Sequence, residues 1–458
     1  MIRGALPTIL HAADPTPLVK LQRVASGLAA EVYVKCEYLR PGGSGRTPML
    51  RHLVDEAERR GALVPGGTLV AAVFDDAGAA LTTIAAVRGY ACVCVVPDRA
   101  PAERLVALRA RGARVVVCPT DLEPDDARSA RAVARRLAGE TPRAFLVDPA
   151  GSPDNAAAHA RFTGPELWAQ TDGAIDVLVV GLATGGTIAG VGRALRERKP
   201  GVRLVGVDPL GSLYHDYLHS GRVTRGFARE VEGIGGDFVP STLEPALIDE
   251  VVRVDDKASF LTARELLRRE GLAVGGASGA AVAGALAYAR RAGRAENIVV
   301  LLPDAAGEAL SPIFDDAWLR ARGFLEAQPG LGVVADVLRD KSGEVIAARA
   351  HDRVRDVISR MKAHGISQLP VLEGGRLIGA VAEVDLLRYL VSGEHSLDSP
   401  VGVLAEHDYA TVTAETAVER VQGLLGDVRM AIVLGDDGGI AGVVTKIDLI
   451  DYLARRTA

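Results

Sequence analysis

Short runs rich in valine and leucine alternate with stretches of helical length from the N-terminus to about residue 320. The runs include EVYVKCEYL, TLVAAVF, DVLVVGL and NIVVLLP, and most are followed by a stretch rich in alanine and arginine. Near-continuous apolar strands separated by helices are typical of a parallel sheet with helices on both faces. The sequence therefore predicts an α/β fold, with parallel sheets covered by helices, for this part of the chain.

Length and charge limit the remaining possibilities. A chain of 458 residues is too long for one ordinary hydrophobic core and long enough for two or three. The net charge is -5, and acidic and basic residues are interleaved, which gives no field that attracts nucleic acid or a membrane surface. The N-terminal residues are interrupted by Pro7 and Pro15 and resemble neither a signal peptide nor a membrane span. We expect a cytoplasmic protein whose partners are small molecules or other proteins.

A different pattern begins after FLEAQPGLG. A strand, helix, strand, Gly-Gly turn, strand and helix follow one another, and the same order then repeats to the end of the chain. Superposing the two copies places Asp385 on Asp448, with Gly379 and Gly442 at the same distance before each. This internal repeat predicts a first domain over residues 1–322, a linker at 323–332 and a second domain over 333–458, with repeats at about 333–392 and 398–458.

The repeat resembles a pair of cystathionine β-synthase (CBS) domains, known as a Bateman module. The element GVVTKIDLIDYL carries the resemblance, which implies that Thr445 and Asp448 bind the ribose of an adenosine-containing ligand such as AMP, ATP or S-adenosylmethionine. In the first repeat, GAVAEVDLLRYL has Ala382 where the hydroxyl belongs, so at most one competent site is expected. The alternative is that the module only mediates dimerisation.

The first domain resembles the cystathionine β-synthase and cysteine synthase family, whose members are fold type II pyridoxal-phosphate enzymes. The matching stretches include DPTPLVKL, TGPELWAQ, GVDPLGS, VEGIGGDFVP and EGLAVGGASGAAV. The heme-binding extension of some members has no counterpart, so no heme is expected. The resemblance implies that a glycine-rich loop cradles the cofactor phosphate at a helix N-terminus. This loop comprises Thr184, Gly185, Gly186 and Thr187.

The residue that should hold the cofactor differs from the family's. The run from Pro41 to Pro48 places Arg46 where the resemblance calls for the lysine that forms a Schiff base with pyridoxal phosphate. A guanidinium stays charged and cannot form an aldimine. We therefore expect pyridoxal phosphate to be absent as an aldimine and at most bound non-covalently. Lys35, the nearest lysine in the sequence, lies in a strand where active members also keep a lysine, so it is a poor substitute.

Other positions implied by the resemblance are altered too. The substrate loop contains Asp75 and Asp76, whose carboxylates would repel a substrate carboxylate. The glutamine and aromatic residue that help to hold that carboxylate are replaced by Pro149 and Ala150. The serine near the pyridine nitrogen falls at Ala277 or Ser278, and the sequence does not decide between them.

A buried charge needs a partner, which suggests what Arg46 does. We hypothesise that Arg46 pairs with Asp75 or Asp76 and that this ion pair occupies the former cofactor pocket. Alternatively, Arg46 and the glycine-rich loop together bind another phosphorylated ligand. No metal site is expected, because His215 and His219 lack a third ligand and the four cysteines lie in apolar strands without a C-x-x-C pair.

Three functional hypotheses follow. The favoured one is a pseudoenzyme, expected from the family to be a homodimer and open to a protein partner, that senses an adenosine-containing ligand through Thr445 and Asp448. The second is an active cystathionine β-synthase or cysteine synthase that joins serine or O-acetylserine to homocysteine or sulfide. The third is an enzyme of another class that uses Asp75 or Asp76 as an acid or base.

Overall fold

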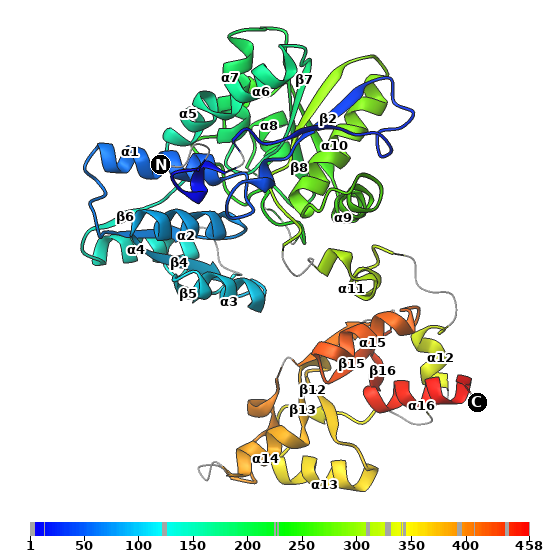
Figure 1. Cartoon of the computed structure of the whole chain (residues 1–458). Coiled ribbons are helices and arrows are strands. Elements are labelled where there is room, and N and C mark those ends of the chain that lie inside the picture. The colour runs from blue at the N-terminus through cyan, green and yellow to red at the C-terminus, as the bar shows by residue number, and fades with distance from the viewer. Residues whose placement is uncertain are drawn as a thin grey trace. The chain divides into compact units, whose positions relative to one another are not determined.

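The structure is a computed structural model of the whole chain. It describes residues 5–12, 14–120, 126–223, 226, 229–307, 312–325, 331–339, 341, 345–391, 396–406, 408–435 and 439–457. The chain forms two compact units, Met1–Ile313 and Phe314–Ala458 (Figure 1). Within the predicted linker, residues 326–330 lie outside the described residues.

A six-stranded sheet forms the larger half of the first unit, and all its pairs are parallel except β1 with β2. In spatial order its strands are β1 (Leu18–Lys20), β2 (Glu31–Lys35), β10 (Asn297–Leu301), β7 (Val177–Gly181), β8 (Arg203–Pro209) and β9 (Glu250–Val254). Consecutive residues of β7 are buried from Val177 to Val180, which requires cover on both faces. Figure 1 shows α9 and α10 on one side of this sheet and α5, α6 and α7 on the other.

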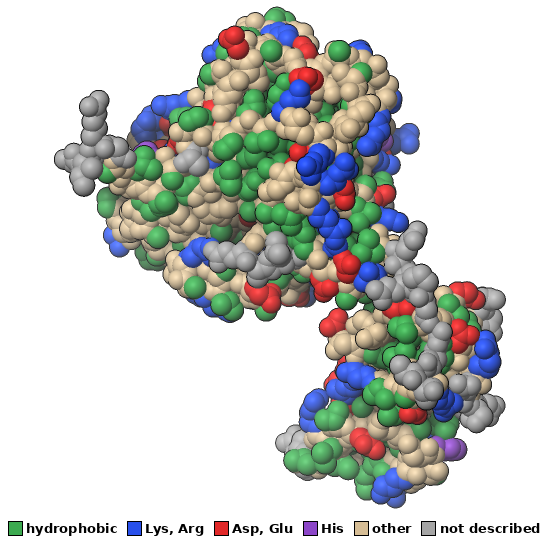
Figure 2. Space-filling model, turned by 45° about the vertical axis from the view of Figure 1, so that its right-hand side comes forward, with side chains coloured by type: hydrophobic (Ala, Val, Ile, Leu, Met, Phe, Trp, Pro, Cys, Tyr) green, Lys and Arg blue, Asp and Glu red, His purple; other side chains and the backbone are tan. Residues whose placement is uncertain are grey.

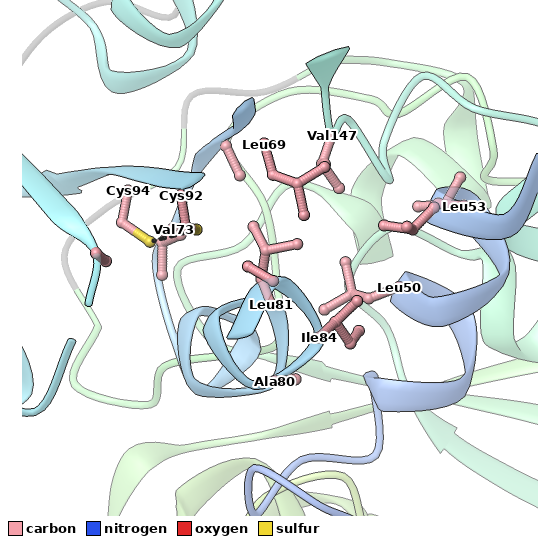
Figure 3. Close-up of a cluster of buried hydrophobic side chains, with 14 of the residues drawn as sticks. Leu50, Leu53, Leu69, Val73, Ala80, Leu81, Ile84, Cys92, Cys94 and Val147 are labelled. Carbon is pink, nitrogen blue, oxygen red and sulfur yellow. Dashed lines mark hydrogen bonds between the residues drawn. The ribbon is translucent and has the colours of Figure 1, made fainter. Parts of the chain in front are cut away.

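A four-stranded, all-parallel sheet forms the smaller half, in the order β5 (Arg114–Cys118), β4 (Ala91–Pro97), β3 (Thr68–Ala72) and β6 (Ala144–Leu146). Alternate residues of β3 face opposite sides: Leu69 joins a core with α1 and α2, whereas Val70 packs towards α4. Figure 3 shows the first of these cores, in which Leu50 and Leu81 lie with Leu69. Burying each such leucine stabilises the fold by about 1.5 to 3 kcal/mol.

The helices of the first unit separate these strands, as the sequence predicts. They are α1 (Thr47–Arg59), α2 (Ala77–Arg88), α3 (Ala102–Ala110), α4 (Ala130–Glu140), α5 (Asp154–Arg161), α6 (Thr163–Thr171), α7 (Gly186–Arg196), α8 (Tyr214–Ser220), α9 (Asp256–Glu265) and α10 (Gly276–Ala292). On the face in Figure 2, acidic and basic side chains lie near one another with hydrophobic ones between them. The predicted α/β fold with parallel sheets is confirmed.

The second unit contains two similar three-stranded sheets. The strands of the first sheet are β11 (Ala348–Arg349), β12 (Gln368–Glu373) and β13 (Arg376–Ala382), and those of the second are β14 (Tyr409–Val412), β15 (Met430–Leu434) and β16 (Ile440–Thr445). In each sheet the first pair is parallel and the second antiparallel, with a β-bulge beside Gly379 or Gly442. Ala380 packs with Met430 and Ile432, so a hydrophobic cluster joins the two sheets.

The helices of the second unit complete the two repeats. They are α11 (Asp316–Ala321), α12 (Val334–Arg339), α13 (Val354–His364), α14 (Glu383–Val391), α15 (Val418–Asp427) and α16 (Lys446–Thr457). The strand-to-helix element is the same in both copies, since α14 follows β13 as α16 follows β16. Throughout the described parts of both units, no helix is long and apolar enough to cross a membrane.

Candidate functional site

The loop before α1 is fixed by close backbone contacts. Gly42 has a φ of 87°, and a Cβ there would lie 2.7 Å from the Cα of Ala80 in α2, so only glycine fits. The N–H of Gly45 donates to the carbonyl of Pro303 at 2.7 Å, and Ser44 forms a β-bridge with Asp304. These contacts hold the next residue, Arg46, between α2 and the segment after β10.

The side chain of Arg46 is mostly buried and is paired twice. Its Nη2 lies 2.8 Å from Oδ2 of Asp75, and its Nη1 lies 2.7 Å from Oδ1 of Asp76. Nη2 also donates to the carbonyl of Gly233 at 2.7 Å. The exposed fractions are 18%, 16% and 21% for the side chains of Arg46, Asp75 and Asp76. The predicted ion pair is confirmed, and it involves both aspartates rather than one.

Three carboxylates surround one guanidinium in this cluster, because Asp304 also lies close enough to Arg46 for their charges to interact. Burial raises the pKa of Asp76 to about 7, with help from the charges of Asp75 and Asp304 and against the opposing charge of Arg46. Oδ2 of Asp76 has no hydrogen-bond partner among the described residues. Asp76 therefore holds a proton up to about neutral pH, which leaves Asp75 as the main counter-charge.

Ala277 and Ser278, the two candidates for the position near the pyridine nitrogen, lie at the start of α10 and contact Asp304 in different ways. Its carboxylate accepts from the N–H groups of Ala277 at 3.1 Å and Ser278 at 2.7 Å. The hydroxyl of Ser278 bonds to the backbone of Asp304, whereas the methyl of Ala277 lies 3.5 Å from the Cβ position of Gly233. Ala277 is therefore the one that faces the Arg46 cluster.

The glycine-rich loop opens α7 as predicted. Gly185 has a φ of 81°, and a Cβ at Gly186 would lie 2.3 Å from Oδ1 of Asn155. Within the described parts of the chain, no acceptor is present for the N–H groups of Thr184 to Thr187. Free N–H groups at the positive end of a helix dipole suit an anion such as a phosphate.

Pro149 and Ala150 contribute backbone rather than side-chain groups. The carbonyl of Pro149 accepts from Nδ2 of Asn155 at 2.8 Å, and Nδ2 also donates to Oγ1 of Thr184 at 2.9 Å. The hydroxyl of Thr242 donates to the carbonyl of Thr184 at 2.5 Å. Pro149 thus supports the glycine-rich loop through Asn155 and Ala150 supports it through Thr242, and neither side chain carries a donor for a carboxylate.

His159 lies between the loop and the Arg46 cluster. Its Nε2 is 3.1 Å from Oγ1 of Thr187, and its Nδ1 is 3.1 Å from Oγ1 of Thr163. Burial, and then the positive charges of Arg40 and Arg46, lower its pKa to about 4. It is therefore neutral at physiological pH. The predicted residues form two neighbouring clusters, one around Arg46 and one around the glycine-rich loop.

The two clusters fit the phosphate group of pyridoxal phosphate but not its aldehyde. The loop suits the phosphate, but the position for the aldehyde faces Arg46 and its two aspartates. Lys35 does not offer a substitute amine: it is fully buried, donates to the carbonyl of Thr16 at 2.7 Å and is ion-paired with Glu166. Lys20 and Lys199 are held in ion pairs with Glu31 and Asp176. An aldimine does not fit these residues.

The second unit brings Thr445 and Asp448 together at the start of α16. Oδ2 of Asp448 accepts from the N–H of Thr445 at 2.7 Å and from its hydroxyl at 2.6 Å. Lys341 donates to the same oxygen at 2.8 Å and to the carbonyl of Val443 at 2.9 Å. The carboxylate of Asp448 is thus already neutralised by a half-exposed lysine.

In the first repeat, the equivalent aspartate is paired with an arginine. Asp385 is only 5% exposed, and both its oxygens accept from Nη1 of Arg429, at 2.9 and 2.7 Å. Arg429 belongs to the other repeat and is also paired with Asp408. Both oxygens of Asp385 are therefore already engaged by Arg429, and the expectation of at most one competent site stays a prediction.

Comparisons with known proteins identify the family. A model of the pyridoxal-phosphate dependent enzymes matches residues 9–304, and one of the CBS domain matches residues 334–392 and 401–455. The chain is 32% identical over 464 residues to the cystathionine beta-synthase of Apis mellifera, covering 98% of this chain and 91% of that protein. The chain belongs to the cystathionine β-synthase family.

Further relatives agree with this membership. The cystathionine beta-synthase of Oryctolagus cuniculus is 33% identical over 474 residues, which cover 98% of this chain and 85% of that protein. The crystal structure of an O-acetylserine dependent cystathionine beta-synthase from Helicobacter pylori superposes with a TM-score of 0.61 at 30% identity, over 67% of this chain and 98% of that one. The predicted fold type II core with a C-terminal CBS pair is thereby confirmed.

Sequence reasoning missed several partners of these family positions. Gly233 acts through a backbone carbonyl, which leaves no mark in the sequence. Asn155 lies one turn before His159 on the same helix, and nothing in the sequence pointed to its contact with Gly186. Lys341 and Arg429 come from segments distant from the aspartates they neutralise.

His215 and His219 stack on each other in α8, and the described residues contain no group of three metal ligands.

The raised pKa of Asp76 predicts a particular pH dependence of stability. The folded state binds a proton that the unfolded state releases near pH 4, so this contribution is complete at low pH and is lost as the pH rises through 7. We expect Asp76→Asn to be more stable than wild type at pH 8 by on the order of 1 to 3 kcal/mol and to show a flatter profile between pH 5 and 8. Urea unfolding across this range measures the difference.

Asp75→Asn is the matched control, because it removes the main counter-charge of Arg46. It should lower stability at every pH and shift the pH-dependent step to lower pH, since the like charge beside Asp76 is gone. An Asp76→Asn variant that is less stable than wild type by the same amount at pH 5 and pH 8 would contradict the assignment of the proton.

Proposed function

We propose that this chain is a pseudoenzyme of the cystathionine β-synthase family, in which the former cofactor pocket is held closed by an ion pair and regulation acts through the CBS pair. The double pairing of Arg46 with Asp75 and Asp76 carries this proposal. An amine must be unprotonated to attack an aldehyde, and a guanidinium between two carboxylates never is. The chain would then act as a ligand-dependent structural or signalling protein, expected to be a cytoplasmic homodimer.

The names of the relatives favour the second candidate, an active enzyme that joins serine or O-acetylserine to homocysteine or sulfide. That chemistry requires an electron sink and a lysine that holds it and moves the α-proton. The contacts of Lys35 argue against a replacement lysine. The third candidate has the raised pKa of Asp76 in its favour, but Arg46 already engages both aspartates.

We further propose that an adenosine-containing ligand binds beside Asp448. A carboxylate that already accepts from Thr445 has the geometry to accept from ribose hydroxyls once Lys341 is displaced. The displaced ammonium would then lie beside the ligand, where it favours a phosphate over the cationic sulfonium of S-adenosylmethionine. This argues for AMP or ATP as the ligand.

Arg46→Lys tests the pseudoenzyme directly. The new amine should remain protonated between Asp75 and Asp76, so we expect no measurable β-replacement from serine or O-acetylserine with homocysteine or sulfide. Product formation followed by chromatography checks this expectation. Robust turnover by Arg46→Lys would mean that the remaining residues still suffice for catalysis.

Asp448→Asn tests the nucleotide site. We expect at least about tenfold weaker binding of AMP or ATP, measured by calorimetry, because a charge-assisted hydrogen bond to the ribose is lost. Asp451→Asn, which changes an exposed aspartate on the same helix, should leave affinity unchanged. Lys341→Gln should weaken AMP more than S-adenosylmethionine. Equal affinities of wild type and Asp448→Asn would remove this site from the proposal.

A further inference from the structure

Arg131, the second residue of α4, lies near two phenyl rings from other segments. Its guanidinium carbon is 3.4 Å from the centre of the Phe238 ring and 5.6 Å from that of Phe74. Phe74 directly precedes Asp75, and Phe238 follows the glycine-rich segment that begins at Gly233. Rings on the faces of a guanidinium hold its plane in a fixed orientation and leave its N–H groups pointing along that plane.

Those N–H groups have no acceptor. Throughout the described chain, Arg131 makes no hydrogen bond with its side chain and has no carboxylate within 4.0 Å. Burial lowers its pKa, because the surroundings do not compensate for the lost water. A planar fork of free donors in a partly buried place is the arrangement that recognises a carboxylate or a phosphate by two parallel hydrogen bonds.

A second guanidinium, that of Arg229, lies in the same surroundings. It too has no side-chain hydrogen bond or ion pair with any described residue, and burial lowers its pKa. Arg131 and Arg229 both lie within electrostatic range of Asp237 and Tyr214. Nε of Arg229 is 3.0 Å from the Cβ position of Gly235. Leaving two guanidiniums unpaired is costly, so an external counter-ion is the expected compensation.

Tyr214 adds an independent polar group. Its side chain is only 1% exposed, yet its hydroxyl has no hydrogen-bond partner in the described parts of the chain. That oxygen lies 2.2 Å from the Cβ position of Gly236, so glycine is needed there to keep the hydroxyl uncovered. The hydroxyl is not among the buried atoms that lack a partner, so its oxygen remains accessible and can bond to a ligand oxygen.

The charges around these groups favour an anion. Arg99 also lies within electrostatic range of Arg229, and Arg135 within that of Arg131. Against them stand exposed Asp237, Asp148, which lies 3.9 Å from Arg135, and buried Asp208, whose pKa is raised by burial. Positive charge therefore exceeds negative charge among the described residues of this surface.

We propose that Arg131 and Arg229, with the hydroxyl of Tyr214, bind the phosphate of a small phosphate monoester beside Phe74 and Phe238. A dianion matches two guanidiniums better than a carboxylate, which carries one charge. None of these three residues belongs to the glycine-rich loop, to the Arg46 cluster or to the CBS pair. This proposal can therefore be tested separately from the proposed function.

Inorganic phosphate is the probe, and the full chain is the sample. At pH 8 phosphate should raise the unfolding temperature of wild type above that in sodium chloride of equal ionic strength, and calorimetry should give its affinity. Arg131→Lys and Arg229→Lys keep the charge but lose the planar fork, so each should bind phosphate at least about tenfold more weakly. Arg135→Lys, one turn further along α4, is the matched control and should bind as wild type does.

Arg131→Lys and Arg229→Lys each test the site on their own, so the test survives if one of them fails to fold. A variant is used once its unfolding transition in chloride matches that of wild type. Wild-type affinity in both lysine variants would overturn the proposal and place the phosphate elsewhere, at the start of α7 for example. Acetate that stabilises wild type more than phosphate does would overturn the choice of a phosphate. No stabilisation by phosphate beyond chloride would overturn the site itself.

Discussion

A guanidinium keeps its charge at any pH that a protein experiences, so a fold that buries Arg46 must surround it with acceptors. Asp75, Asp76 and the carbonyl of Gly233 fill this role from two separate segments. Removing the charged partner of such a pair, here Asp75, typically costs about 3 to 5 kcal/mol, because the remaining charge stays buried. The same contacts draw together the starts of α1 and α2 and the loop at Gly233, so the centre of the first unit depends on this one charge.

In the second unit, too, each charged residue at the equivalent position has a partner of opposite charge. The partner differs between the two repeats. Asp385 is neutralised by Arg429 and buried, whereas Asp448 is neutralised by Lys341, whose side chain is 44% exposed. A solvated lysine is cheaply displaced, because water can replace its partner. Arg429 is 31% exposed, but it contacts both oxygens of Asp385 and is also paired with Asp408, so its displacement breaks more contacts. The repeat is therefore symmetric in its backbone and asymmetric in what each aspartate can bind, and the asymmetry comes from residues outside the matching motifs.

The sequence predicts the backbone better than the site. Val177 to Val180 are buried on both faces, and such a run has few other solutions than a parallel sheet between helices. The pairing of Arg46 was predictable because a buried charge needs a partner. That both aspartates bind it, and that one of them holds a proton, depends on the nearby Asp304, which the chain order does not reveal. Ala277 and Ser278 differ by one step of a helix, so only coordinates decide which faces Arg46.

We propose that no lysine of this chain holds pyridoxal phosphate. The absorbance spectrum of the purified protein, recorded after incubation with pyridoxal phosphate and desalting, tests it most directly. The account predicts that no aldimine band is retained, since Arg46 occupies the position and Lys35 is buried in ion pairs. A stoichiometric aldimine band that survives desalting would contradict the account and restore the enzyme as the better interpretation.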